Sequence, residues 1–112
     1  SAPKHEAVRN AVRLIEGNPE QFRDITSLAK SVGLSVTHLE RLFRSEVRLS
    51  CGKYLRKRRM EYARELLVNS TQPIKEIAYR LGYAHPTHFS RDVKRHWKKS
   101  PAELRVNGGV VS

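Results

Sequence analysis

Two stretches of the chain repeat the same pattern of residues, and this duplication limits the possible folds more than any other feature. The first stretch covers residues 25–54 and the second covers residues 74–104. Matching positions are 49 residues apart up to a central turn and 50 residues apart after it. The matched pairs are Ile25/Ile74, Leu28/Ile77, Ala29/Ala78, Val32/Leu81, Gly33/Gly82, Leu34/Tyr83, Thr37/Thr87, His38/His88, Leu39/Phe89, Arg41/Arg91, Phe43/Val93, Arg44/Lys94 and Ser50/Ser100. A tandem unit in so short a chain indicates a ligand that is itself periodic.

The net charge suggests which ligand this is. The chain has 22 Lys and Arg residues against 11 Asp and Glu residues, a net charge of +11. Such an excess favours polyanions, with nucleic acid first and anionic membranes second. The basic residues are dense in residues 41–65 and 91–105, so both dense zones begin in the second half of a repeat. One basic run is usually a solvated face, but two runs in phase with a repeat favour a binding surface.

The other bulk properties narrow the class of protein. No apolar run has the length of a membrane span and no signal peptide is evident, so we expect no membrane partner. The single cysteine, Cys51, cannot form an internal disulfide. This fits a reducing compartment, and we expect the protein in the cytoplasm.

Apolar residues recur at helical spacing along the whole chain, and strand patterns are absent. Caps and helix breakers divide the pattern into seven helices, which predicts an all-α fold. The expected helices cover residues 5–16, 26–32, 35–46, 50–69, 73–81, 86–97 and a short last segment that begins with a capping box at Ser100. We expect one lobe at residues 1–50, a linker helix at 51–69, a second lobe at 70–105 and a flexible tail at 106–112.

Each copy has the residues that a helix-turn-helix motif requires. The two helices cross at a steep angle, so the first helix needs a small residue, which Ala29 and Ala78 supply. The turn needs a residue that adopts positive φ, which Gly33 and Gly82 supply. Ala-x-x-x-Gly alone mostly indicates close helix packing. The same pattern twice, each time followed by an apolar pair four residues apart, predicts two helix-turn-helix lobes.

The second helix of each copy has a polar face opposite its apolar pair. The residues on this face are Thr37, Arg41 and Arg44 in the first copy and Thr87, Arg91 and Lys94 in the second. Arginine can form a bidentate contact with the O6 and N7 atoms of guanine, and a helix N-terminus with basic flanks suits phosphates. We therefore predict that both helices read double-stranded DNA in the major groove.

The linker helix has the right length for this role. Its 19 residues extend about 28 Å at ~1.5 Å per residue, and successive major grooves on one face of B-DNA are ~34 Å apart. We expect the two reading helices to enter adjacent major grooves of one duplex.

Three stretches carry a family resemblance: LAKSVGLSVTHLERLFR, YLRKRRMEYARELL and IKEIAYRLGYAHPTHFSRDVKRHWKKSPAELR. With this layout the chain resembles, over nearly its whole length, the DNA-binding domain of AraC/XylS-type bacterial transcription regulators. The resemblance implies seven helices, two helix-turn-helix lobes and a linker helix. The predicted base-reading residues are Thr37, His38, Arg41, Thr87, His88 and Arg91. The predicted DNA-backbone contacts are Ser35, Arg44, Arg48, Lys94, Arg95, Lys98 and Lys99.

The resemblance also implies partners. In this family the domain usually follows a ligand-binding or dimerisation domain, so we expect the chain to be the C-terminal part of a longer regulator. RNA polymerase is an expected partner, and activation of transcription is the expected role. The residues themselves leave activation and repression open.

The chain departs from the family pattern at a few positions. Arg48 and Lys98 stand where the family tends to have glycine, at a cost of about 1 kcal/mol each if φ is positive there. Cys51 stands in place of proline. In the second copy, Val93 stands in place of phenylalanine and Asp92 matches Leu42. We expect the second lobe to pack less well and to differ in what it reads.

Several residues have a second interpretation. His85 and His88 lie close in sequence, but no Cys/His cluster with metal-ligand spacing exists, so we expect no metal and no cofactor. Cys51 is interpreted as a small residue at a helix start, with a redox-sensing thiol as the alternative. Trp97 is expected to pack in the core. Within the run 56–59, Arg59 is expected to have a partly packed stem.

Two other functions remain to be weighed. The alternative to DNA recognition is a basic helical protein-interaction or RNA-binding module. Single-stranded RNA readers usually expose aromatic side chains, whereas most aromatics here fall on expected inward faces: Phe22, Phe43, Phe89, Tyr54, Tyr62, Tyr83 and Trp97. No catalytic motif is found, so we do not expect an enzyme.

Overall fold

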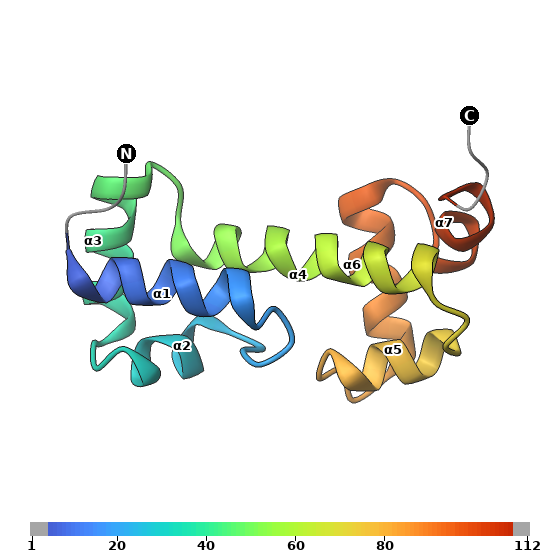
Figure 1. The fold of residues 1–112 in the computed structure, drawn as a ribbon, viewed down its shortest axis with the longest axis horizontal. Helices are drawn as coiled ribbons and strands as arrows, with labels where there is room; N and C mark the ends of the chain where they lie inside the picture. Colours follow the sequence, from blue (N-terminus) through green and yellow to red (C-terminus); the bar gives the residue numbers. More distant parts are fainter. Residues whose placement is uncertain (1–4, 109–112) are drawn as a thin grey trace. The chain divides into compact units, whose positions relative to one another are not determined.

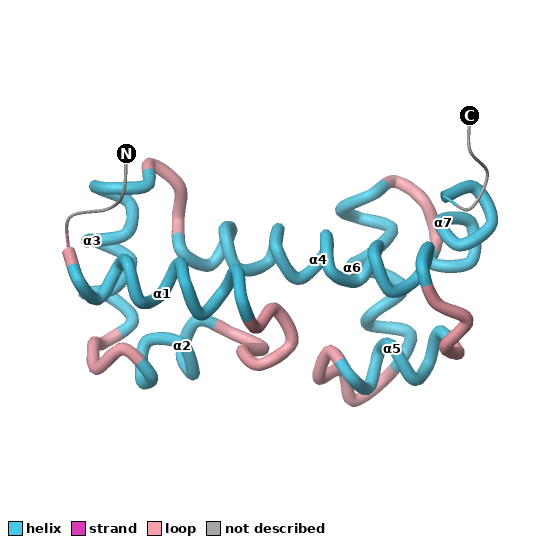
Figure 2. Tube along the Cα trace, viewed as in Figure 1, coloured by secondary structure: helices cyan, strands magenta, loops and turns pink. Residues whose placement is uncertain are grey.

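The computed structural model describes residues 5–108, and all regular structure within this range is helical (Figures 1 and 2). The helices are α1 (Glu6–Gly17), α2 (Ile25–Ser31), α3 (Val36–Val47), α4 (Cys51–Asn69), α5 (Ile74–Arg80), α6 (Pro86–Trp97) and α7 (Pro101–Gly108). The predicted all-α fold with seven helices is confirmed. The chain divides into two compact units, Ser1–Arg58 and Arg59–Ser112, and the boundary falls within α4.

Local hydrogen bonds explain why the helices begin where they do. The Ser35 hydroxyl accepts from the N–H of His38 at 3.1 Å, which caps α3 as the sequence predicts. The predicted capping box at α7 also forms, because Ser100 Oγ accepts from the N–H of Glu103 and the Glu103 carboxylate accepts from the N–H of Ser100. The backbone bond from Ser100 holds the pKa of Glu103 below its usual value.

Most helix ends lie within one residue of the prediction, and the start of α5 and the end of α7 are the differences with a structural meaning. Pro73 lies at the N-cap of α5 rather than in its first turn, and its carbonyl accepts from the N–H of Glu76 and of Ile77. The last helix continues to Gly108, so residues 106–108, which the sequence assigns to a flexible tail, are helical. The rest of that expected tail, residues 109–112, lies outside the described part of the chain.

The first unit is built around α3. This helix packs against α1 and α2, and its Leu39 and Phe43 side chains have no exposed surface. The buried cluster consists of Val8, Ala11, Ile15, Phe22, Leu28, Ala29, Leu39, Phe43, Cys51 and Leu55. Cys51 and Leu55 bring the first turns of α4 into this core.

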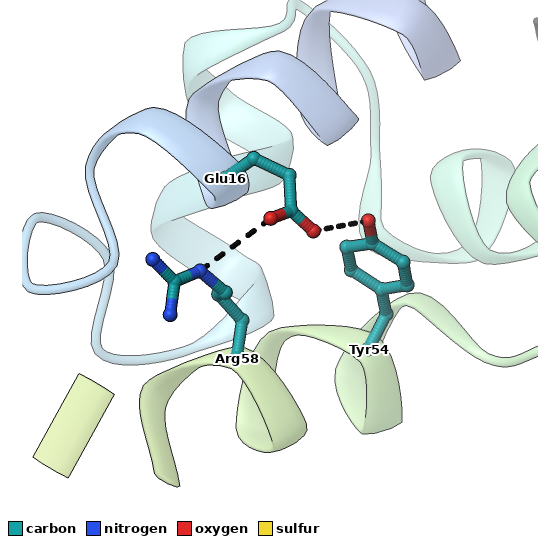
Figure 3. Close-up of polar contacts among 3 residues, drawn as sticks. All are labelled: Glu16, Tyr54 and Arg58. Carbon is teal, nitrogen blue, oxygen red and sulfur yellow. Dashed lines mark hydrogen bonds and ion pairs between the residues drawn. The ribbon is translucent and has the colours of Figure 1, made fainter. Parts of the chain in front are cut away.

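Polar contacts attach the same part of α4 to α1, as Figure 3 shows. The Tyr54 hydroxyl donates to one oxygen of Glu16, and the Nε atom of Arg58 lies 3.5 Å from the other. The Tyr54 ring also meets the Phe43 ring edge-on, with 5.4 Å between centroids. Because Phe43 belongs to α3, Tyr54 links α1, α3 and α4 in one cluster of contacts.

The second unit repeats this plan around α6. This helix packs against α5 and α7, and its Phe89 and Val93 side chains are fully buried. The buried cluster consists of Met60, Ala63, Leu67, Ile77, Ala78, Leu81, Phe89, Val93 and Leu104. Val93, which stands where the family tends to have phenylalanine, has no exposed surface.

Left-handed residues end α3 and α6. Arg48 has φ 67° and Lys98 has φ 64°, and these are the two non-glycine residues with positive φ in the described part of the chain. In each case the residue's N–H bonds the carbonyl four positions back, Arg44 or Lys94. This is the geometry that favours glycine, so the positive φ on which the expected cost depends is present at both positions.

Replacing Arg48 by glycine should therefore stabilise the protein relative to replacing it by alanine. Both variants remove the same charged side chain, but only glycine adopts the left-handed conformation without strain. The free energy of unfolding of Arg48→Gly should therefore be about 1 kcal/mol larger than that of Arg48→Ala. Denaturant unfolding of both variants measures this difference. Equal midpoints would show that the positive φ of Arg48 stores no strain.

Candidate nucleic-acid interface

The turns of the two helix-turn-helix motifs have the same geometry. Gly33 has φ 75° and Gly82 has φ 91°, as the sequence predicts for both. The N–H of the next residue bonds back to the alanine carbonyl in each copy, from Leu34 to Ala29 and from Tyr83 to Ala78, both at 3.0 Å. These bonds fix the direction in which the following helix leaves the turn.

In the first motif, α3 presents a polar face opposite its buried side. Thr37 and Arg41 are exposed, whereas Leu39 and Phe43 on the other side are completely buried. His38 is half-buried, and its backbone N–H bonds the capping Ser35. The helix therefore offers a short hydroxyl near its N-terminus and a guanidinium one turn later.

The second motif presents the same groups on α6. Thr87, His88 and Arg91 are all exposed. The rings of His85 and His88 meet edge-on, with 5.4 Å between centroids. Arg91 keeps 59% of its side chain exposed, and its Nε atom lies 3.9 Å from Oδ1 of Asp92.

The predicted backbone contacts lie on exposed surface in both units. All seven of these side chains belong to exposed residues: Ser35, Arg44, Arg48, Lys94, Arg95, Lys98 and Lys99. The six basic ones lie in the last turns of α3 and α6 or just after them. Ser35 uses a lone pair for the cap of α3, which leaves its hydroxyl proton available as a donor. Each of these exposed polar faces is thus followed by positive charge, which suits phosphate contacts.

Glu40 has a structural role that the helical pattern alone does not predict. Its carboxylate accepts from the N–H of Cys51 at 2.6 Å and from the N–H of Gly52 at 3.2 Å, so α3 caps the start of α4. The matching position in the second copy is Ser90, and Pro101, which matches Cys51, has no N–H to bond. This difference between the copies is the signal from which the Glu40 cap could have been found.

The environment of Cys51 decides between its two interpretations. The residue has no exposed surface. Burial, and then the charge of Glu40, raise the pKa of the Cys51 thiol to about 12. The thiol is therefore protonated at neutral pH, which fits a packed residue at the start of α4 and contradicts a reactive sensor.

Two arginines hold the second unit together in ways that the sequence only partly indicates. Arg59 is only 6% exposed, so its charged head is buried as well as its stem, and it donates to the carbonyl of Leu81. Arg105 of α7 donates from Nε to the carbonyl of Leu67 and from Nη2 to the carbonyl of Ser70. These bonds satisfy carbonyls at the ends of α5 and α4.

Trp97 packs against the second core, as predicted. Its indole Nε1 donates to the carbonyl of Met60 at 3.0 Å, and the Arg64 guanidinium lies 5.7 Å from the centre of the ring. The indole is therefore a structural contact between α6 and α4 and is not presented as a stacking surface.

Residues 5–108 contain neither a metal-binding cluster nor a membrane-spanning helix. No group of three or more His, Cys, Asp and Glu side chains is placed to hold a metal ion there. No helix in the same range has the length and apolar character that crossing a membrane requires.

Known proteins are similar to this chain over most of its length. A helix-turn-helix domain family matches residues 28–107. The chain is 36% identical over 105 residues to the transcriptional regulator GlxA of Rhizobium meliloti and 32% identical over 101 residues to the lactose operon transcription activator of Staphylococcus xylosus. These alignments cover 94% and 90% of the chain but only 32% and 36% of the two relatives. The regulatory protein SoxS of Salmonella typhimurium is 31% identical, with 89% of the chain and 94% of SoxS covered.

Solved structures give the same result. The C-terminal domain of AraT, a response regulator from Geobacillus stearothermophilus, is 33% identical with a TM-score of 0.82, covering 96% of this chain and 90% of that domain. An AraC-type DNA-binding domain protein from Chromobacterium violaceum is 32% identical with a TM-score of 0.74, covering 90% of each chain. The DNA-binding domain of the transcription factor AdpA, solved with a target DNA, is 28% identical with a TM-score of 0.76, covering 92% of this chain and 93% of that domain.

The family match, the relatives and the two helix-turn-helix motifs all indicate the DNA-binding domain of a transcription regulator. This chain belongs to the AraC/XylS family of bacterial transcription regulators, in which it corresponds to the helix-turn-helix DNA-binding domain.

Proposed function

We propose that the chain binds double-stranded DNA with sequence specificity and that α3 and α6 are its recognition helices. The observation that carries this proposal is the repeated reading face, in which Thr37 and Arg41 match Thr87 and Arg91. Each face lies opposite a fully buried apolar pair, so the polar side chains are held outward. The structure of AdpA with its target DNA supports the same use of this fold.

We further propose that the two helices enter adjacent major grooves. The 19 residues of α4 form one unbroken helix. Its length of about 28 Å at ~1.5 Å per residue is close to the ~34 Å repeat of the major groove. The expected DNA site contains two short clusters of specified bases about one helical turn apart.

The alternative of single-stranded RNA recognition is less well supported by the side chains. Stacking requires exposed aromatic rings. Among the described residues, Tyr79 is the only exposed aromatic, at 50%, while Phe22, Phe43 and Phe89 are buried. A single exposed tyrosine on α5 does not form a stacking platform, so duplex DNA is the better-supported ligand.

The wider role follows from the relatives and is likewise proposed. GlxA and the lactose operon activator are about three times longer than the segment matched. We propose that this domain works with a separate sensor or dimerisation domain, that it acts as a transcription activator, and that RNA polymerase is its protein partner. Its place of action would be the bacterial cytoplasm, where the chromosome lies.

Binding of the 112-residue chain to matched probes tests the proposed ligand. The probes are the duplex recovered from a randomised library, a scrambled duplex of the same composition, and single-stranded RNA of the same length. At one salt concentration the recovered duplex should bind about 10³-fold or more tightly than the scrambled one. Equal affinity for the two duplexes, or tighter binding to the RNA, would reject sequence-specific DNA recognition.

A further inference from the structure

Among the differences between the two copies, two matched positions that face each other stand out. The repeat matches Leu34 with Tyr83 and Leu42 with Asp92. In the first unit, both leucines pack against the apolar core. In the second unit, the Tyr83 hydroxyl donates to Oδ2 of Asp92 at 2.8 Å. A hydrogen-bonded pair thus replaces two apolar side chains at the same place in the motif.

Tyr83 is itself firmly held. Its ring packs edge-on against Phe89, with 5.4 Å between centroids, and its side chain also bonds the buried Arg59. Burial, and then the bond to Asp92, raise the pKa of Tyr83 to about 12. The phenol therefore keeps its proton at neutral pH and donates it to the carboxylate. Since the donor is fixed, the orientation of Asp92 is fixed as well.

The second oxygen of Asp92 lies at the limit of ion-pair distance from the neighbouring arginine. Oδ1 lies 3.9 Å from Nε of Arg91, while 59% of the Arg91 side chain and 33% of the Asp92 side chain remain exposed. A guanidinium is planar, so a carboxylate at its Nε edge leaves the two Nη groups free to point outward. These are the groups that can form a bidentate contact with guanine.

The first helix has no counterpart to this arrangement. Arg41 is followed by Leu42, which cannot accept a hydrogen bond. No carboxylate lies within ion-pair distance of Arg41 in the described part of the chain. The two arginines therefore differ in whether a carboxylate lies beside them.

We propose that Asp92, fixed by Tyr83, is a positioning residue that orients Arg91 for guanine and makes α6 a stricter reader than α3. The inference rests on the proposed function and adds a specificity determinant to it. Ordering a long side chain in advance lowers the entropy lost on binding. The carboxylate also repels phosphate, so it should raise specificity while it lowers general affinity for DNA. A residue with a purely structural role would not change these two quantities in opposite directions.

The variant Asp92→Asn separates these effects because it keeps the shape and loses the charge. The probes are the duplex recovered from a randomised library and versions of it with each base of the second cluster replaced. Discrimination at the position read by Arg91 should fall about threefold to tenfold in Asp92→Asn, whereas affinity for a scrambled duplex should stay equal or rise. Tyr83→Phe leaves Asp92 without its hydrogen-bond donor, so discrimination at the same base position should also fall.

The double variant Tyr83→Leu/Asp92→Leu is the matched control for folding. It places the residues of the first copy in the second, so its melting temperature should stay within about 5 °C of the original, while its discrimination should fall as in Asp92→Asn. If Asp92→Asn and Tyr83→Phe keep full discrimination, the proposal is wrong. It is also wrong if Asp92→Asn weakens binding to the recovered and scrambled duplexes in parallel and lowers the melting temperature.

A further variant, Arg91→Ala, distinguishes failure of this inference from failure of the proposed function. If Arg91→Ala relaxes the base preference but Asp92→Asn does not, only the positioning role is rejected. If Arg91→Ala itself keeps the original preference, α6 does not read bases through Arg91, and both proposals fail.

Discussion

Replacing Arg91 by alanine should flatten the base preference of one half of the DNA site and leave the other half unchanged. Arg91 is exposed on α6, with its apolar neighbours Phe89 and Val93 completely buried. A bidentate contact between arginine and guanine contributes about 1–3 kcal/mol of discrimination. Arg41→Ala should have the same effect on the other half, since Arg41 occupies the matching position on α3.

Competition binding with single-base variants of the recovered duplex measures both effects. Neither substitution touches a core, so the melting temperatures should stay close to the original. Tyr79→Ala is a suitable control, because Tyr79 is half exposed on α5 and lies outside both predicted reading faces. The assignment of the reading helices fails if either arginine variant relaxes both halves equally or if neither changes any base preference.

Affinity for duplex DNA should fall steeply as salt is added. Six exposed basic residues follow the two reading faces, and each is a predicted phosphate contact. If all six neutralise a phosphate, log Kd should change with log salt with a slope of magnitude about 5, and affinity should fall about 10³-fold between ~50 and ~200 mM salt. Titrations of one labelled duplex at several salt concentrations measure the slope.

Single variants show which residues contribute to that slope. Lys98→Ala should reduce its magnitude by about 1 and weaken binding to all sequences by a similar factor. A slope of magnitude near 1 would contradict an interface of six phosphate contacts. An unchanged slope in Lys98→Ala would remove Lys98 from the interface.

The sequence predicts the helices well because the signals that start and end them are local. Ser35 and Ser100 cap helices within three residues, and Gly33 supplies the positive φ that its turn requires. The exposure of Arg41 and Arg91 also follows from local periodicity, since the opposite side of each helix is apolar. These features depend on neighbours in the chain, so they can be inferred before the packing is known.

Features that depend on crossing helices are harder to predict. Glu40 caps α4 from eleven positions away in the sequence, and its reach depends on how α3 meets α4. The buried head of Arg59 depends on a carbonyl at the end of α5. From the sequence alone, Asp92 looks like an unfavourable replacement for leucine. Its hydrogen-bond donor, Tyr83, lies in the turn before α6 and is identified only from the packing. In each case the sequence gives the side chain, but its hydrogen-bond partner belongs to another helix or turn, so the contact cannot be predicted from local pattern.

Selection of bound sites from duplexes with a randomised core, at fixed salt, tests most directly whether this chain reads DNA with two helices. The account predicts recovered sites with two short clusters of preferred bases separated by about one helical turn, or ~10 base pairs between centres. Recovery of a single cluster, of two clusters with no fixed spacing, or of no preferred bases would contradict it.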